Sequence, residues 1–76
     1  MTLTATKKMR RARRLMAARE KVGDLFIHRT DFHWQRTMPD GTLLDFWPST
    51  GKWMHNGVLH ESDLNQLLTY IENGGV

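Results

Sequence analysis

The sequence predicts a single small α+β domain in which two helices pack on an antiparallel sheet, in the order α-β-β-β-α. Three observations predict this fold. A segment rich in Ala, Lys and Arg comes first, runs of β-forming residues separated by turn residues fill the middle, and a leucine-rich amphipathic segment comes last. A chain of 76 residues has room for one domain, so we treat residues 1–76 as a single unit.

The first helix is expected at residues 6–22. Thr4 or Thr6 would serve as the N-cap, and Gly23 would end the helix. Its residues are good helix formers, and a step of 100° per residue gathers the apolar ones on one side. These apolar residues are Met9, Ala12, Leu15, Met16 and Val22.

Positive charge is concentrated on this helix. Residues 1–23 hold eight basic residues and one acidic residue, a net charge of +7, whereas the rest of the chain has a net charge of −4. The candidate binding residues, which fall in one arc opposite the apolar side, are Lys7, Arg10, Arg11, Arg14 and Lys21. Such a stripe is suited to a phosphate backbone, to an acidic protein surface, or simply to solvent.

The middle of the chain predicts a sheet over residues 25–57. β-forming runs occupy residues 25–28, 32–36, 42–47 and 52–55. Turn residues separate the later runs at 38–41, 48–51 and 56–57. We expect an antiparallel meander of three strands, or four.

The last helix is expected at residues 63–73. Ser62 would be its N-cap, and Asn73 with Gly74 would end it. Apolar residues then follow at the spacing i, i+3, i+4 and i+7, namely Leu64, Leu67, Leu68 and Ile71. This helix would cover the same sheet face as the first.

Aromatic residues are abundant for so short a chain, which has three tryptophans. Most of them are expected in the core, because a small domain needs large side chains to bury enough area. Trp34 and Trp53 are the candidates for exposed stacking or docking residues, with Arg36 or Lys52 assisting the basic helix.

Catalytic and metal chemistry is less well supported by the pattern. The chain has no cysteine, and its four histidines do not have the spacing of an established zinc site. No paired carboxylates, phosphate-binding glycine loop or nucleophile elbow is present. We therefore expect neither a catalytic residue, a metal, a cofactor nor a small-molecule substrate. No window approaches the ~20 apolar residues of a membrane span.

The segment Asp45-Phe46-Trp47-Pro48-Ser49-Thr50-Gly51-Lys52-Trp53 carries a family resemblance. It resembles a motif of small uncharacterised bacteriophage and prophage proteins, in which an aromatic strand runs into Pro-Ser/Thr-Thr-Gly-Lys-Trp. The closing helix, with Leu67-Leu68-Thr69-Tyr70-Ile71, is similar too. The resemblance implies a phage-encoded accessory protein made in the cytoplasm of a bacterial host, where such proteins often redirect or block host or defence machinery.

A weaker resemblance is to small toxin ribonucleases with a double-stranded-RNA-binding-like α-β-β-β-α fold. In those enzymes the catalytic histidine follows Gly-Ser, whereas here Thr30-Asp31-Phe32 precedes His33.

The function that the sequence predicts is binding to nucleic acid or a nucleoprotein complex. The alternatives are an inhibitor that docks on a host or defence-system protein, and a ribonuclease that uses His33.

Overall fold

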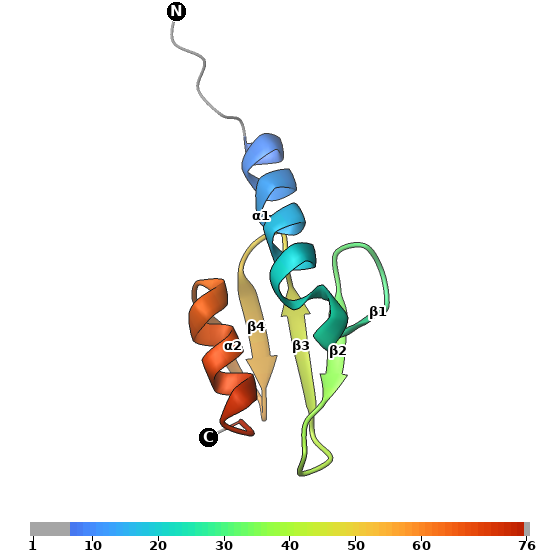
Figure 1. The fold of residues 1–76 in the computed structure, drawn as a ribbon, viewed down its shortest axis with the longest axis vertical. Coiled ribbons are helices and arrows are strands. Elements are labelled where there is room, and N and C mark those ends of the chain that lie inside the picture. The colour runs from blue at the N-terminus through green and yellow to red at the C-terminus, as the bar shows by residue number, and fades with distance from the viewer. Residues whose placement is uncertain (1–6, 76) are drawn as a thin grey trace, which may run out of the picture.

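Two helices lie on one face of a five-stranded antiparallel sheet in the computed structural model, which describes residues 7–75 (Figure 1). The predicted α+β class is confirmed. The elements are α1 (Lys7–Val22), a 3-10 turn η1 (Gly23–Leu25), β1 (Ile27–His28), β2 (Trp34–Thr37), β3 (Leu43–Trp47), β4 (Lys52–His55), β5 (Val58–Glu61) and α2 (Leu64–Glu72). The proposed N-cap positions Thr4 and Thr6 lie outside the described residues.

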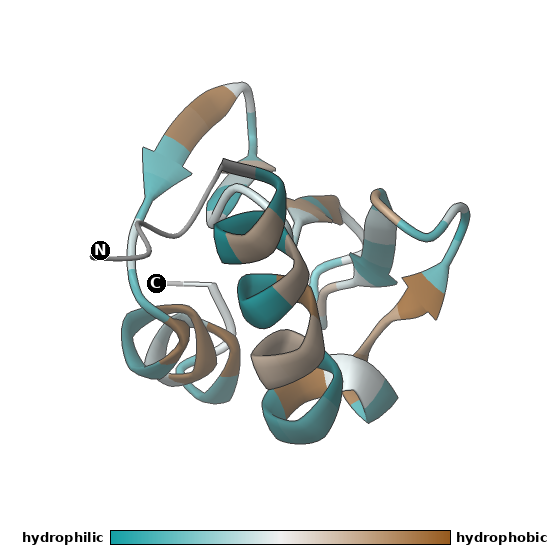
Figure 2. Cartoon of the chain, turned by 90° about the horizontal axis from the view of Figure 1, so that it is seen from above, coloured by the Kyte–Doolittle hydropathy of each residue, from teal (hydrophilic) through white to brown (hydrophobic). Residues whose placement is uncertain are grey.

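The strands follow one another across the sheet in chain order, so the sheet is a simple meander. Seen along the long axis of the molecule, the sheet curves around both helices and leaves its other face uncovered (Figure 2). The sheet extends to Glu61 rather than ending at residue 57. β5 was not predicted, because a histidine and a glutamate form its second half. The turn before β5 was predicted, and its residues Asn56 and Gly57 have φ values of 52° and 77°.

Turn residues act where the sequence predicts. Gly41 donates its N–H to the carbonyl of Met38 over 2.9 Å and has a φ of 87°. Gly51 donates to the carbonyl of Trp47 over 3.0 Å with a φ of 75°. Both glycines occupy the left-handed region, which other residues adopt only at a cost. These turns fix the register of β2, β3 and β4.

The core is a layer of apolar side chains between the helices and the sheet. Its buried members are Ala18, Val22, Phe26, Trp34, Met38, Leu44, Phe46, Trp53, Leu67 and Ile71. The expectation that most aromatic residues belong to the core is therefore confirmed. Phe46 faces inward and Trp47 faces the uncovered side, as neighbours on a strand must.

The apolar side of α1 differs from the expected one. Ala18 and Val22 are buried and Leu15 packs against the core, but Ala12 is exposed, as are Met9 and Met16, the latter with 64% of its surface accessible. Length is the reason for Met9 and Ala12, because the first two turns of α1 run past the end of the sheet (Figure 1). Met16 lies further along the helix and is exposed because it is on a different side from Ala18 and Val22. Helical periodicity predicts a face but not how much of it is covered.

α2 begins one residue later than expected. Its N-cap is Asp63, whose side chain accepts a hydrogen bond from the backbone N–H of Gln66 over 2.8 Å. Ser62, the predicted cap, instead accepts a hydrogen bond from Nε1 of the buried Trp53 over 2.9 Å. The indole nitrogen thereby finds a partner inside the domain, and the serine joins β4 to the start of α2.

A series of side-chain hydrogen bonds connects Asp40, Thr42, His55 and Tyr70. The hydroxyl of Thr42 donates to the carboxylate of Asp40 over 2.6 Å and lies 2.6 Å from Nε2 of the buried His55. Because that hydroxyl has only one proton, Nε2 must donate to it. The hydroxyl of Tyr70 is the hydrogen-bond partner of Nδ1 and can donate its proton to it. The series joins β4 to α2 and to the loop before β3.

We expect Tyr70→Phe to lower the free energy of unfolding by about 1–2 kcal/mol, because Nδ1 of His55 is then buried without its partner. The matched control is Thr69→Val, which removes an exposed hydroxyl of the same helix and should cost less than about 0.5 kcal/mol. Equilibrium unfolding in urea measures both losses. Equal losses would contradict the assigned role of His55.

The Thr42 hydroxyl, and after it the Thr42 backbone N–H, hold the pKa of Asp40 below its usual value. A lowered pKa stabilises the folded protein above the unfolded-state value of about 4, and this contribution is lost as the pH falls through the folded-state pKa. We expect Thr42→Val to raise the pKa of Asp40, whereas Thr42→Ser keeps the hydroxyl and the lowered pKa. Titration of the Asp40 carboxyl carbon by NMR tests this, and identical pKa values in the two variants would refute it.

Candidate nucleic-acid interface

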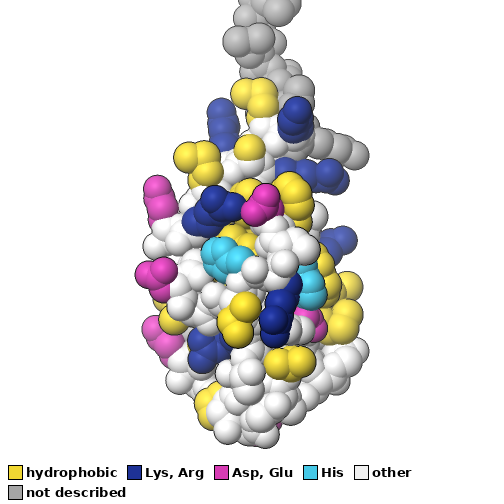
Figure 3. All heavy atoms as spheres, turned by 90° about the vertical axis from the view of Figure 1, so that its right-hand side faces the viewer, with side chains coloured by type: hydrophobic (Ala, Val, Ile, Leu, Met, Phe, Trp, Pro, Cys, Tyr) yellow, Lys and Arg dark blue, Asp and Glu magenta, His cyan; other side chains and the backbone are white. Residues whose placement is uncertain are grey.

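The first turns of α1 form an exposed cationic end to the molecule. The side chains of Lys8, Arg10, Arg11, Arg13 and Arg14 are all exposed, and the sequence has no acidic residue before Glu20. On the face seen in Figure 3, several basic side chains lie in the upper part of the molecule, with apolar ones among them. Lys7 begins the helix, but its side chain lies outside the described part of the chain. This end of α1 provides a dense positive field with little neutralisation close by.

The turn between β3 and β4 brings a further cation to this helix. Arg10, Arg11 and Arg14 line one hollow together with Thr50, Lys52 and Glu61, a surface that we call the basic groove. The 48–51 turn is held in place by the N–H of Ser62, which donates to the carbonyl of Gly51 over 3.3 Å. The structure thus places Lys52 beside the predicted arginines, although about forty residues separate them in the sequence.

Lys21 lies further down the same side of α1. It shares a hollow of about 470 Å³ with Arg14, between α1, the 48–51 turn and the start of α2. Its ammonium group donates a hydrogen bond to Oδ1 of Asn65, which joins the two helices. Asp63 lines the same hollow, so the positive field is weaker here than at the basic groove. Lys21 therefore has a structural contact as well as a place on the stripe.

Three predicted site residues do not belong to this surface. Trp34 is fully buried and Trp53 retains only 4% exposure, so neither ring can stack on a ligand without unfolding the core. Arg36 is half-buried on β2, where Nη1 donates to the carbonyl of Leu25 over 3.0 Å. Both tryptophans are buried because a domain this small needs the apolar surface of large side chains in its core. The guanidinium of Arg36 satisfies the last carbonyl of η1 instead of reaching a ligand.

Phe32 is an exposed aromatic residue that the sequence did not predict as a site residue. It lies in the loop between β1 and β2, with 59% of its surface exposed, and lines a hollow with Lys8, Arg11, Ala12 and Leu15, which we call the Phe32 hollow. Arg11 lines both this hollow and the basic groove. No local sequence signal marks it, because residues 32–36 form one β-forming run, whereas the strand begins only at Trp34.

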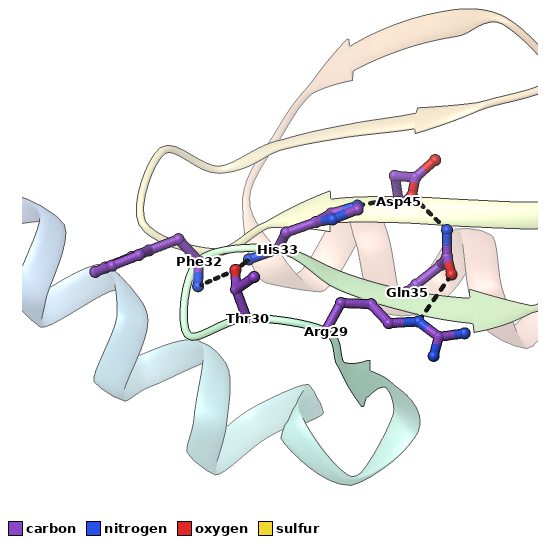
Figure 4. Close-up of polar contacts among 6 residues, drawn as sticks. All are labelled: Arg29, Thr30, Phe32, His33, Gln35 and Asp45. Atoms are coloured by element: carbon purple, nitrogen blue, oxygen red, sulfur yellow. Dashed lines mark hydrogen bonds and ion pairs between the residues drawn. The ribbon is translucent and has the colours of Figure 1, made fainter.

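His33 takes part in a hydrogen-bond network on the uncovered sheet face (Figure 4). Its Nε2 lies 2.8 Å from Oδ1 of Asp45, which also accepts a hydrogen bond from Nε2 of Gln35 over 2.9 Å. Oε1 of Gln35 in turn accepts from Nε of Arg29, and the His33 ring stacks on Trp47 with centroids 5.2 Å apart. An imidazole paired with a carboxylate has the chemistry of a general base. The same hydrogen bond can also have a purely structural role, because it joins β3 to the residue that precedes β2.

The described residues 7–75 hold no cluster of three side chains able to bind a metal ion. Nor does any helix in that range have the length and apolar character needed to cross a membrane. Comparison with family models, with curated proteins and with solved structures found no significant match for this chain.

A double-mutant cycle tests the tie between His33 and Asp45. Both side chains are about one third exposed, so we expect a coupling free energy of about 0.5–1 kcal/mol between His33→Ala and Asp45→Ala. Urea unfolding of the four proteins at neutral pH gives this value. A coupling indistinguishable from zero would mean that the pair does not hold the strands together.

Proposed function

We propose that this protein is a bacteriophage accessory protein that acts in the host cytoplasm by binding nucleic acid, free or within a nucleoprotein complex, through the exposed end of α1 and the basic groove. The proposed phage origin and cytoplasmic location rest on the resemblance of the segment from Asp45 to Trp53 to small phage proteins. The observation that carries the binding function is the convergence of Lys52 with Arg10, Arg11 and Arg14 on one surface.

Electrostatics explains why such a surface suits a polyanion. Like charges held on one surface repel one another, so their spacing destabilises the free protein slightly. A phosphate backbone removes this repulsion, and it releases counterions that add to the affinity at low salt. Arginine contributes further, since its planar guanidinium forms paired hydrogen bonds with phosphate oxygens.

The basic groove contains side chains of both charges, so the effect of charge on binding can be tested in both directions. We expect Arg14→Gln to weaken binding to a nucleic-acid duplex and to reduce the slope of log affinity against log salt by about 0.9, the value for one phosphate contact. Glu61→Gln removes an acidic group from the same groove and should strengthen binding. Fluorescence anisotropy with labelled oligonucleotides between 50 and 200 mM salt measures both effects.

The control variant for this test is Arg29→Gln. Arg29 has the same charge and is also exposed, but it lies on the uncovered sheet face, bonded to Gln35 (Figure 4). It should leave the salt slope unchanged. If Arg29→Gln weakens binding as much as Arg14→Gln does, net charge rather than the basic groove determines the affinity, and the proposed site is wrong.

A second candidate function is docking on a host or defence-system protein. The uncovered sheet face favours it, because the apolar side chains of Ile27, Leu43 and Leu59 are exposed there. A partner that stays bound to the tagged protein in host lysate after nuclease treatment supports this candidate. Loss of all partners on nuclease treatment supports the nucleic-acid function.

The His33–Asp45 pair keeps a ribonuclease as the third candidate. Cleavage of RNA by the purified protein, abolished by His33→Ala, would support it.

A further inference from the structure

We propose that Phe32 is a stacking platform for an unpaired base of a nucleic-acid strand, whose phosphates are bound by Lys8 and Arg11. This inference rests on the proposed nucleic-acid function and specifies its ligand as single-stranded. Lys8, Arg11 and Phe32 line one hollow, and Arg11 also lines the basic groove.

Lys8 and Arg11 lie on the same side of α1 as the residues that pack on the core. The residues that pack toward the body are Leu15, Ala18 and Val22, spaced by three and four. Continued toward the N-terminus, the same alternation of four and three reaches Arg11 and Lys8. Both therefore lie on the side of α1 that packs on the core further along, rather than opposite the apolar side as the sequence predicted for Arg11. Their side chains are exposed because the sheet ends before this part of the helix, so an anionic ligand can reach them.

The loop that carries Phe32 is held in a defined shape. The hydroxyl of Thr30 accepts hydrogen bonds from the backbone N–H groups of Phe32, over 3.1 Å, and His33, over 2.9 Å. Asp31 lies 3.7 Å from Arg19 of α1, which joins the loop to the helix. The ring extends from this loop on the side of α1 (Figure 4). Its position is thus prepared before a ligand arrives, which reduces the ordering cost of binding.

The exposure of the ring argues that its role is not structural. Phe32 keeps 59% of its surface accessible, while Phe26 and Phe46 of the core are buried. The hollow beside the ring has a volume of about 660 Å³, within the range of pockets that hold small organic ligands. An aromatic base that stacks on the ring covers apolar surface which the fold leaves in water.

The chemistry of the hollow favours a nucleotide over an apolar side chain of another protein. A docked leucine would cover Phe32, but it would also take Lys8 and Arg11 out of water without a partner, which is costly. A nucleotide provides both halves, since its base has a π-face and its phosphate pairs with the cations. An unpaired base is required, because bases inside a duplex are stacked on one another and cannot lie on the ring.

The test compares a single-stranded oligonucleotide with a hairpin duplex of the same length, in DNA and in RNA, by fluorescence anisotropy. We expect Phe32→Ala to weaken binding to single strands by about tenfold and to leave duplex binding and the salt slope unchanged. Phe32→Trp should retain the affinity, since its ring also stacks. Ile27→Ala, a truncation of another exposed apolar residue on the uncovered sheet face, should have no effect.

The outcomes separate this inference from the proposed function. Binding to single strands that is as strong for Phe32→Ala as for the unchanged protein overturns the stacking role and leaves the basic groove standing. A preference for the duplex that is insensitive to Phe32 overturns it as well. No binding to either oligonucleotide at 50 mM salt overturns the proposed function and this inference together.

Discussion

The sheet ends before α1 does, and most features of the molecule follow from this difference in length. Leu15, Ala18 and Val22 fasten the second half of the helix to the core. The first half continues beyond it with its basic side chains exposed (Figure 1). A shorter helix would present fewer cations, and a longer sheet would bury the hollows that open beside the overhanging turns. The projecting end is therefore a consequence of how the core is built, and it is also the most highly charged surface.

The overhanging first half of α1 has little to stabilise it. Its cations repel one another, and basic residues near a helix N-terminus oppose the helix dipole. Packing does not compensate there, since the side chains of residues 8–14 are all exposed. A polyanion along the basic groove would reverse both effects, because it neutralises the cations and favours the helical form. We therefore expect the overhang to become more ordered on binding, and the rest of the domain to change little.

Much of the fold could be predicted from the sequence, because its signals are local. Gly41 and Gly51 mark turns that need a positive φ, and the spacing of Leu67 and Ile71 defines the buried face of α2. The candidate site was predicted less completely. Lys52 lines the same groove as three of the predicted arginines, but no local pattern shows that Trp34 is needed in the core while a phenylalanine in a nearby loop stays exposed. Exposure depends on which elements cover which, and that is settled only in three dimensions.

Chemical-shift mapping by NMR would show whether the projecting end of α1 and the basic groove bind nucleic acid. A short single-stranded oligonucleotide is added to the isotope-labelled protein at low salt, and the backbone amide shifts are followed. We expect the largest changes at residues 8–15, around Thr50 and Lys52, and at Phe32, with little change at Leu43 and Leu59 on the uncovered sheet face. Changes concentrated on that face, or no changes at all, would contradict this binding site.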